Sequence, residues 1–205
     1  MGRKPSDRPV AIVEAAVQEF ADHGFEGASW RRIAERAGVA QSLLTYHFAD
    51  KEGLWRAAYR HARDRKVADN PAFPRVAPPS EGGAPDRAAV EAWLTGYVRG
   101  FARHPELSRM QVNEGRRGSA RTRWAAKDSL KADYDAFEAE LAKLQAHGWF
   151  AGVAPHQLVY MLVGAAQYAF LVPSHVKTLT GRDATGKAYA DAHAAAVAAL
   201  FMRFA

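Results

Sequence analysis

The sequence has no cysteine among its 205 residues. This absence excludes disulfide bonds, cysteine zinc sites and redox sensing through a thiol. Long apolar runs are also missing, because no window approaches the roughly 20 apolar residues that a membrane-spanning helix needs. Residues 1–9 are polar and basic with no apolar core behind them, so we expect no secretory signal. We therefore expect a cytoplasmic protein without a membrane partner.

Sequence motifs of the common enzyme classes are absent as well. There is no nucleotide-binding glycine loop, no HExxH and no GxSxG, and the histidines are scattered without a helical pair of the metal-ligand kind. No segment alternates apolar and polar residues as a half-buried strand would, and there is no internal repeat. These absences predict an all-α protein that is not an enzyme and that needs no cofactor or metal.

The composition places the chain among globular proteins, with 48% hydrophobic and 24% charged residues. A net charge of +6 suits a partner that carries phosphates, but it does not require one. The basic excess is only modestly denser in the N-terminal third of the sequence. Charge alone therefore does not identify a nucleic-acid-binding protein.

Residues 29–54 form the most informative stretch and predict two short helices joined by a tight turn. Ser29 is a good N-cap for a first helix that opens at Trp30, and Gly38 is a typical residue to end it. A second short helix is expected at residues 40–48, with Leu44 facing inward. Polar side chains then remain for its outer face. This is the helix-turn-helix arrangement, whose second helix enters the DNA major groove.

The same stretch resembles the signature of the TetR/AcrR family of transcriptional regulators. The resemblance rests on one ungapped series of residues: Ile33-Ala34-Glu35, Ala37-Gly38-Val39, Leu44, Tyr46-His47-Phe48 and Lys51-Glu52-Gly53-Leu54. It implies an all-helical homodimer with a three-helix DNA-binding domain (residues 1–52) and a helical ligand-binding and dimerisation domain (residues 53–205). It also implies that an unknown small-molecule effector releases a two-fold-symmetric, double-stranded DNA operator. Repression is the outcome that the resemblance favours, with activation as the alternative.

We expect DNA contacts at both motif helices and at the start of the next helix, as a helix-turn-helix arrangement implies. The expected residues are Ser29, Trp30, Arg31, Gln41, Ser42, Leu43, Thr45, Tyr46, His47 and Lys51. Leu43 and Thr45 depart from the commonest family pattern, so the operator sequence does not follow from the resemblance. Lys51 is either a phosphate clamp or an ordinary surface lysine. Arg3 and Lys4 belong either to an unstructured terminus or to a basic arm that touches DNA.

About nine helices are expected from apolar periodicity and from capping or breaking residues. They cover residues 7–23, 30–37, 40–48, 51–62, 87–103, 107–117, 120–147, 155–173 and 187–204. The proline-rich segment 67–85 reads as a linker, or alternatively as a lid over a ligand entrance. A loop through Gly181 and Gly186 is expected before the last helix.

An arginine-rich stretch, Arg109 to Arg123, lies close in sequence to several aromatic residues, and one interpretation is a pocket for a small anionic or polar ligand. The alternative is a solvated helix end whose arginines pair with nearby acids. The candidate pocket residues are Trp93, Tyr97, Phe101, Met110, Asn113, Glu114, Arg117, Trp124, Tyr134, Phe137 and Tyr168. The helix that starts at Lys51 is the expected mechanical link between this pocket and the DNA.

The last two helices of the sequence carry small residues on one flank, which lets helices approach closely. With the family resemblance, this pattern predicts the four-helix homodimer interface. The expected interface residues are Leu158, Leu162, Ala166, Ala188, Ala192, Ala195 and Ala199. Two other classes compete with a regulator: an enzyme, and a structural nucleic-acid binder that would leave two thirds of the chain without a role.

Overall fold

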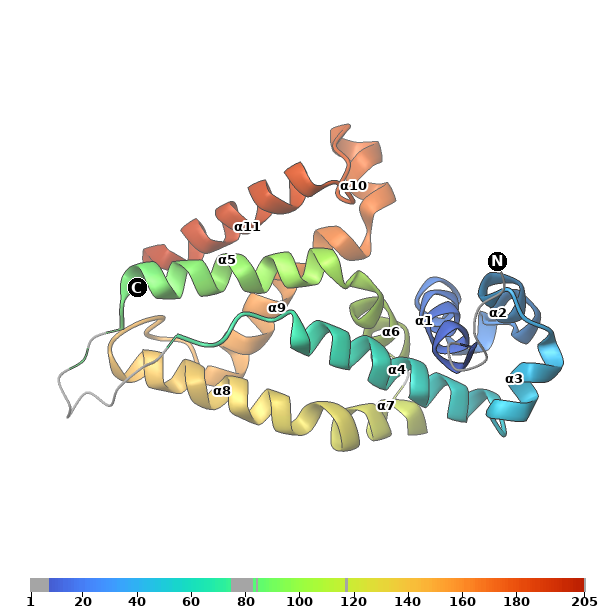
Figure 1. The fold of residues 1–205 in the computed structure, drawn as a ribbon. Helices are drawn as coiled ribbons and strands as arrows, with labels where there is room; N and C mark the ends of the chain where they lie inside the picture. The colour runs from blue at the N-terminus through green and yellow to red at the C-terminus, as the bar shows by residue number, and fades with distance from the viewer. Residues whose placement is uncertain (1–7, 75–82, 84, 117, 205) are drawn as a thin grey trace. The chain divides into compact units, whose positions relative to one another are not determined.

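A computed structural model describes residues 8–74, 83, 85–116 and 118–204. Within these ranges every regular element is a helix, so the all-α prediction is confirmed. The chain forms two compact units (Figure 1). Unit 1 comprises residues 1–68 and 106–129, and unit 2 comprises residues 69–105 and 130–205. Arg3, Lys4, Arg117 and residues 75–82 and 84 of the expected linker lie outside the described residues.

Unit 1 consists of the four N-terminal helices and two short helices from later in the chain. Its helices are α1 (Arg8–Gly27), α2 (Trp30–Ala37), α3 (Gln41–His47), α4 (Lys51–Ala68), α6 (Pro105–Gly115) and α7 (Ala120–Trp124). Helix α1 packs along α4 and against α2. Pro9 lies in the first turn of α1, where its missing N–H costs nothing. At the other end, Gly24 leaves the helical conformation with φ 66°, which confirms the expected break after His23.

Unit 2 is built from the remaining helices. These are α5 (Arg87–Arg103), α8 (Lys131–Ala146), α9 (Pro155–Leu171), α10 (Pro173–Thr180) and α11 (Lys187–Phe201), followed by a short 3₁₀ turn, η4 (Met202–Phe204). Asp86 caps α5 by accepting a hydrogen bond from the backbone N–H of Ala88, as expected. Helix α5 packs against α9 and α11, and α8 packs against α9. Their apolar faces form one continuous core that includes Leu94, Leu141 and Leu162.

Two predicted boundaries are wrong. Helix α10 occupies part of the expected loop, because Pro173 starts a new helix at its N1 position as well as ending the previous one. The single helix expected over residues 120–147 is instead α7, a π-helical segment η3 (Ala125–Leu130) and α8. A π-helical turn inserts an extra residue into the hydrogen-bond ladder and leaves no apolar pattern that the sequence analysis could detect.

The compact units do not follow the expected division at residues 52 and 53. Helix α4 belongs to unit 1 because it buries Leu54, Trp55, Ala58 and Ala62 and packs along α1. The functional division into a DNA-binding and a ligand-binding domain remains a prediction. Within the described ranges, no single helix is long and apolar enough to cross a membrane, although the bent pair α9 and α10 passes the length and composition test when taken together.

Candidate DNA-binding and ligand-binding sites

The turn between α2 and α3 is fixed by one glycine. Gly38 adopts the left-handed conformation (φ 70°, ψ 38°), and its N–H donates to the carbonyls of Ala34 and Glu35 at the end of α2. A side chain with a Cβ would strain this conformation, so glycine is the residue that the turn requires. Ile33 and Leu44 are fully buried on the inner sides of α2 and α3. The two helices therefore have the helix-turn-helix connection that the sequence predicts.

Helix α3 presents a polar outer surface. Gln41, Ser42, Thr45, Tyr46 and His47 are all exposed, and the side chain of Tyr46 reaches 81% exposure, which is unusual for an aromatic residue. The Thr45 hydroxyl donates to the Ser42 carbonyl at 2.9 Å, so it satisfies the helix backbone rather than pointing freely outward.

Leu43 is half-buried, so only part of it is available to a partner.

The start of α2 differs in detail from the prediction. Ser29 occupies the N-cap position, but its hydroxyl makes no capping hydrogen bond. The backbone N–H of Ser29 donates instead to Oε1 of Glu19 at 3.0 Å. Trp30 is half-buried, while Arg31 is exposed and lies 3.5 Å from Glu35 on the same helix. Arg31 is therefore the more exposed of the two, and a DNA contact of either residue stays a prediction.

Glu19 is a structural residue that the sequence analysis missed. Its side chain is fully buried, and its Oε1 also accepts a hydrogen bond from Nε of Arg32 at 2.7 Å. The carboxylate thereby ties α1 to the loop before α2 and to α2 itself. The signal was its position on the same helical face as the buried Ala15 and Ala16, four and three residues earlier, where an acid needs a partner.

Lys51 is not an isolated surface side chain. It starts α4, whose first turn is capped by Asp50 through a 2.7 Å hydrogen bond from the N–H of Gly53. Its Nζ donates to the carbonyl of Glu26 at 3.3 Å and lies 4.9 Å from the centroid of the Phe25 ring. The ammonium thus lies at a helix N-terminus, where the free N–H groups also favour an anion.

Four of the expected ligand residues come together in unit 2. Trp93, Tyr97, Phe101 and Phe137 form a contiguous ring cluster, joined by Phe73, which the sequence analysis did not select. The rings of Phe73 and Trp93 lie 4.4 Å apart, and Tyr97 and Phe137 stack at 5.2 Å. Such spacings leave no room for a ligand between the rings, so a ligand would contact their exposed parts.

Two further candidates of unit 2 are Tyr134 and Tyr168. Tyr134 is half-buried and its ring lies 6.2 Å from that of Tyr160. Tyr168 is 62% exposed on α9. Burial raises the pKa of the Tyr97 phenol well above its usual range, so this hydroxyl stays neutral.

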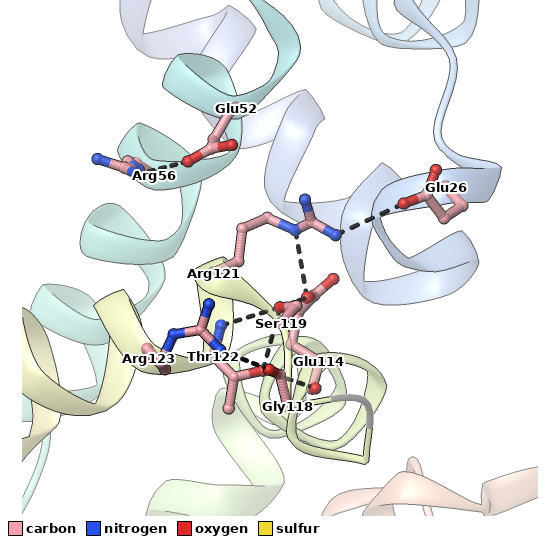
Figure 2. Close-up of polar contacts among 9 residues, drawn as sticks. All are labelled: Glu26, Glu52, Arg56, Glu114, Gly118, Ser119, Arg121, Thr122 and Arg123. Atoms are coloured by element: carbon pink, nitrogen blue, oxygen red, sulfur yellow. Dashed lines mark hydrogen bonds and ion pairs between the residues drawn. The ribbon is translucent and has the colours of Figure 1, made fainter.

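The other described ligand candidates belong to unit 1 and are already engaged. Met110 is buried, and the Asn113 amide donates to the carbonyl of Ala21 at 3.2 Å. Glu114 accepts hydrogen bonds from Ser119 and Arg121 (Figure 2). Trp124 packs against the rings of Trp55 and Tyr59. These contacts match the alternative in which the polar residues of this stretch pair with one another.

The expected dimer residues divide into two groups. Leu158, Leu162 and Ala166 are buried in the core of unit 2, so they offer no surface to a second copy. This burial weighs against an interface role for them, which stays a prediction. Helix α9 is apolar on several faces, so its spacing does not reveal which face the chain itself covers. On α11, the four selected alanines are exposed: Ala188, Ala192, Ala195 and Ala199. The exposed apolar residues of α9 are instead Tyr160, Met161 and Tyr168.

The fold and the exposed α3 surface define a helix-turn-helix DNA-binding protein. A family model described as bacterial regulatory proteins, tetR family, matches residues 12–58. The HTH-type transcriptional regulator RutR of Escherichia coli strain K12 is 31% identical over 180 residues, which cover 87% of this chain and 81% of RutR. The chain therefore belongs to the TetR family of transcriptional regulators.

Two further comparisons agree with this assignment. The HTH-type transcriptional repressor SCO4008 of Streptomyces coelicolor is 28% identical over 186 residues, 90% of this chain and 89% of that protein. The crystal structure of the regulator FadR from Bacillus subtilis in complex with stearoyl-CoA matches with a TM-score of 0.62 at 17% identity, covering 96% of this chain and 99% of that one. These relatives are regulators of transcription, which confirms the predicted non-enzymatic class.

Proposed function

We propose that the chain is a cytoplasmic, ligand-responsive repressor that binds a two-fold-symmetric DNA operator as a homodimer. The observation that carries this proposal is the exposed polar face of α3 beside the ammonium of Lys51. Gln41, Ser42 and His47 supply hydrogen-bonding groups for base edges, while Tyr46 and Lys51 supply groups for phosphates. The relative SCO4008, named a repressor, supports the direction of regulation.

Substitutions of Gln41 and Lys51 distinguish base recognition from phosphate binding in one experiment. A glutamine amide can pair bidentately with adenine, so Gln41→Ala should lose about 1–3 kcal/mol at one base position. Lys51→Ala should weaken binding to all duplexes alike, because a phosphate contact carries no sequence information.

The measurement is fluorescence anisotropy on a duplex selected from a random library and on its single-base variants. Lys143→Ala, which removes a lysine from the surface of α8, is the matched control and should bind as the wild type does. A uniform loss in both Gln41→Ala and Lys51→Ala would contradict the assigned roles.

The homodimer is proposed from the exposed apolar surface of α9 and α11. Tyr160, Met161 and Tyr168 are 70%, 53% and 62% exposed, and Leu200 on α11 is 52% exposed. The exposed alanines of α11 add a smooth flank to this surface. Exposed apolar side chains concentrated on two neighbouring helices are typical of an interaction surface, and a second copy related by a two-fold axis is its natural occupant.

The effector site is proposed at the partly exposed rings of Phe73, Tyr97 and Phe137, which favour a ligand with apolar or aromatic surface. FadR, whose structure contains stearoyl-CoA, shows that a protein of this fold can hold an acyl-CoA. The chain itself connects this effector site to the DNA-binding helices, because α4 ends at Ala68 and Phe73 follows five residues later. Between them, Oδ2 of Asp69 lies 2.6 Å from Nε2 of His104. We expect a ligand that shifts Phe73 to pull on the end of α4 through this short segment.

Thermodynamic linkage between ligand binding and DNA binding makes the proposed effector site testable once a ligand is found. If the ligand weakens DNA binding, saturating operator must weaken ligand binding by the same factor. Screening apolar and aromatic carboxylates by thermal shift, followed by calorimetric titration with and without operator, provides the test. A ligand affinity that operator leaves unchanged would contradict control of DNA release by this site.

A further inference from the structure

Phe25 follows the break at Gly24 near the C-terminal end of α1, and its ring contacts two cations of unit 1. Nζ of Lys51 lies 4.9 Å from the ring centroid, and the guanidinium carbon of Arg121 lies 3.5 Å from it. Lys51 comes from the start of α4, whereas Arg121 comes from α7, some 70 residues later in the chain. The end of α1 is therefore a point where a distant part of the chain reaches the neighbourhood of the proposed phosphate contact.

Glu26, the next residue, is also shared between the same two cations. Its carboxylate lies 3.5 Å from Nη2 of Arg121, while its backbone carbonyl accepts the 3.3 Å hydrogen bond from Lys51 (Figure 2 shows the first contact). Arg121 thus pairs with the carboxylate that lies nearest in sequence to the carbonyl bound by Lys51, and this carboxylate belongs to a side chain that is 69% exposed. When Arg121 does not hold it, the Glu26 carboxylate is free to turn toward the Lys51 ammonium.

The position of Arg121 is set by a buried acid. Its side chain is 13% exposed, and its Nε donates to Oε2 of Glu114 at 3.2 Å, where the Glu114 side chain is 4% exposed. Ser119 donates a second hydrogen bond to the same oxygen at 2.8 Å. A carboxylate so deeply buried holds its cationic partner strongly, because separating them would leave an unpaired buried charge. Figure 2 shows Arg121 reaching from this cluster toward Glu26.

We propose that Arg121 is a positioning residue for DNA binding. Anchored by Glu114, it occupies the Glu26 carboxylate and the Phe25 ring, and thereby keeps the Lys51 ammonium available to a DNA phosphate. A movement of the α6–α7 turn that withdraws Arg121 lets Glu26 compete with the phosphate for Lys51. This inference rests on the proposed role of Lys51 and adds a second route, besides α4, by which later helices control DNA affinity.

The test is a set of five variants measured by anisotropy on the selected duplex over a range of salt concentrations. Lys51→Ala should reduce the slope of log K against log salt by about 0.9, the loss of one phosphate contact. Arg121→Ala should weaken binding roughly three- to tenfold and reduce the slope by a similar amount. Adding Glu26→Gln to Arg121→Ala should restore both, because the competing charge is gone.

Two further variants control for charge and folding. Arg123→Ala removes a neighbouring exposed arginine whose Nη1 donates to the Gly118 carbonyl, and it should leave the affinity within about twofold of the wild type. Arg121→Lys retains a cation beside Glu114 and should fold normally even if Arg121→Ala loses stability. It should show an intermediate affinity, because an ammonium cannot both pair with the two carboxylates and stack on Phe25 as a guanidinium does.

The outcomes separate this inference from the proposed function. If Arg121→Ala and Arg121→Lys bind as the wild type does while Lys51→Ala is weakened, the positioning role is contradicted and the proposed function stands. If Arg121→Ala is weakened but Glu26→Gln does not rescue it, Arg121 is only structural and the inference fails. If Lys51→Ala itself binds normally, the assignment of Lys51 to a phosphate fails first.

Discussion

The guanidinium of Arg32 lies 2.6 Å from the carboxylate of Glu19, whose side chain is fully buried. This pair joins α2 to α1 across a gap of 13 residues and orients the helix that supports α3. A buried carboxylate whose cation is removed keeps its charge without compensation, so the pair contributes to stability mainly through the cost of breaking it.

Arg32→Ala should therefore lower the free energy of unfolding by on the order of 2–3 kcal/mol. This loss is smaller than for a pair in which both side chains are buried, because the Arg32 guanidinium is partly exposed. Arg31→Ala is the matched control, since its pair with Glu35 lies in solvent and should contribute at most about 1 kcal/mol. Urea unfolding followed by circular dichroism measures both. Equal losses in the two variants would show that the Glu19 carboxylate does not depend on Arg32.

Ala195→Asp should convert the proposed dimer to a monomer while preserving helical content. Ala195 is exposed in the single chain, so a charge there disturbs only a contact with a second copy. An unpaired charge buried in that contact costs on the order of several kcal/mol. Sedimentation velocity reports the change. Ala139→Asp, at an exposed alanine of α8, should remain dimeric, and a dimeric Ala195→Asp variant would place the interface elsewhere.

Leu162→Ala should lower the stability of the fold and leave the dimer intact. Leu162 is 1% exposed inside unit 2, so its truncation leaves a cavity and should cost about 2–5 kcal/mol of unfolding free energy. The protein should remain a dimer at concentrations where it is folded. A loss of dimerisation without a loss of stability would return Leu162 to the interface.

Lys66 predicts a dependence of stability on pH. Burial lowers the pKa of Lys66 from 10.5 to about 7, so above pH 7 the unfolded chain binds more protons than the folded chain. Stability should therefore rise with pH from about 7 toward 10, by at most about 1.4 kcal/mol per pH unit. Burial raises the pKa of Tyr59 to about 12, which acts in the opposite direction only above pH 10.

Urea unfolding at several pH values between 7 and 9.5 measures this slope. Lys66→Met should flatten it and stabilise the protein near pH 7, because no ammonium then has to be buried or neutralised. Lys177→Met, at an exposed lysine of α10, should keep the wild-type slope. An unchanged slope in Lys66→Met would mean that another group governs the pH dependence.

The helix-turn-helix was predictable because its determinants are local. Gly38 ends α2 through its own backbone conformation, and Leu44 faces inward through helical spacing alone. The Glu114–Arg121 cluster was only partly visible, since the sequence shows arginines and acids in one stretch without showing which of them meet. The contact of Arg121 with Phe25 joins residues almost a hundred positions apart, and no local pattern encodes it.

The differences between expectation and structure in unit 2 have a similar cause. Helix α9 carries apolar residues around much of its circumference, so Leu162 and Tyr160 look alike in sequence although one is buried and the other is exposed. The aromatic cluster was found in part, but Phe73 was missed because it lies in a segment that reads as a linker. In both cases long-range packing decides the outcome, which periodicity does not describe.

Two copies of the chain are proposed to read a two-fold-symmetric DNA site together. Two recognition helices fixed in one dimer need half-sites on the same face of the duplex, about 34 Å or one turn apart or a multiple of it. The direct measurement is the affinity for the selected operator before and after five base pairs, about half a turn, are inserted between its half-sites. We expect the insertion to lower the affinity to that of a duplex with a single half-site. Equal affinity for the two duplexes would contradict a homodimer that binds both half-sites at once.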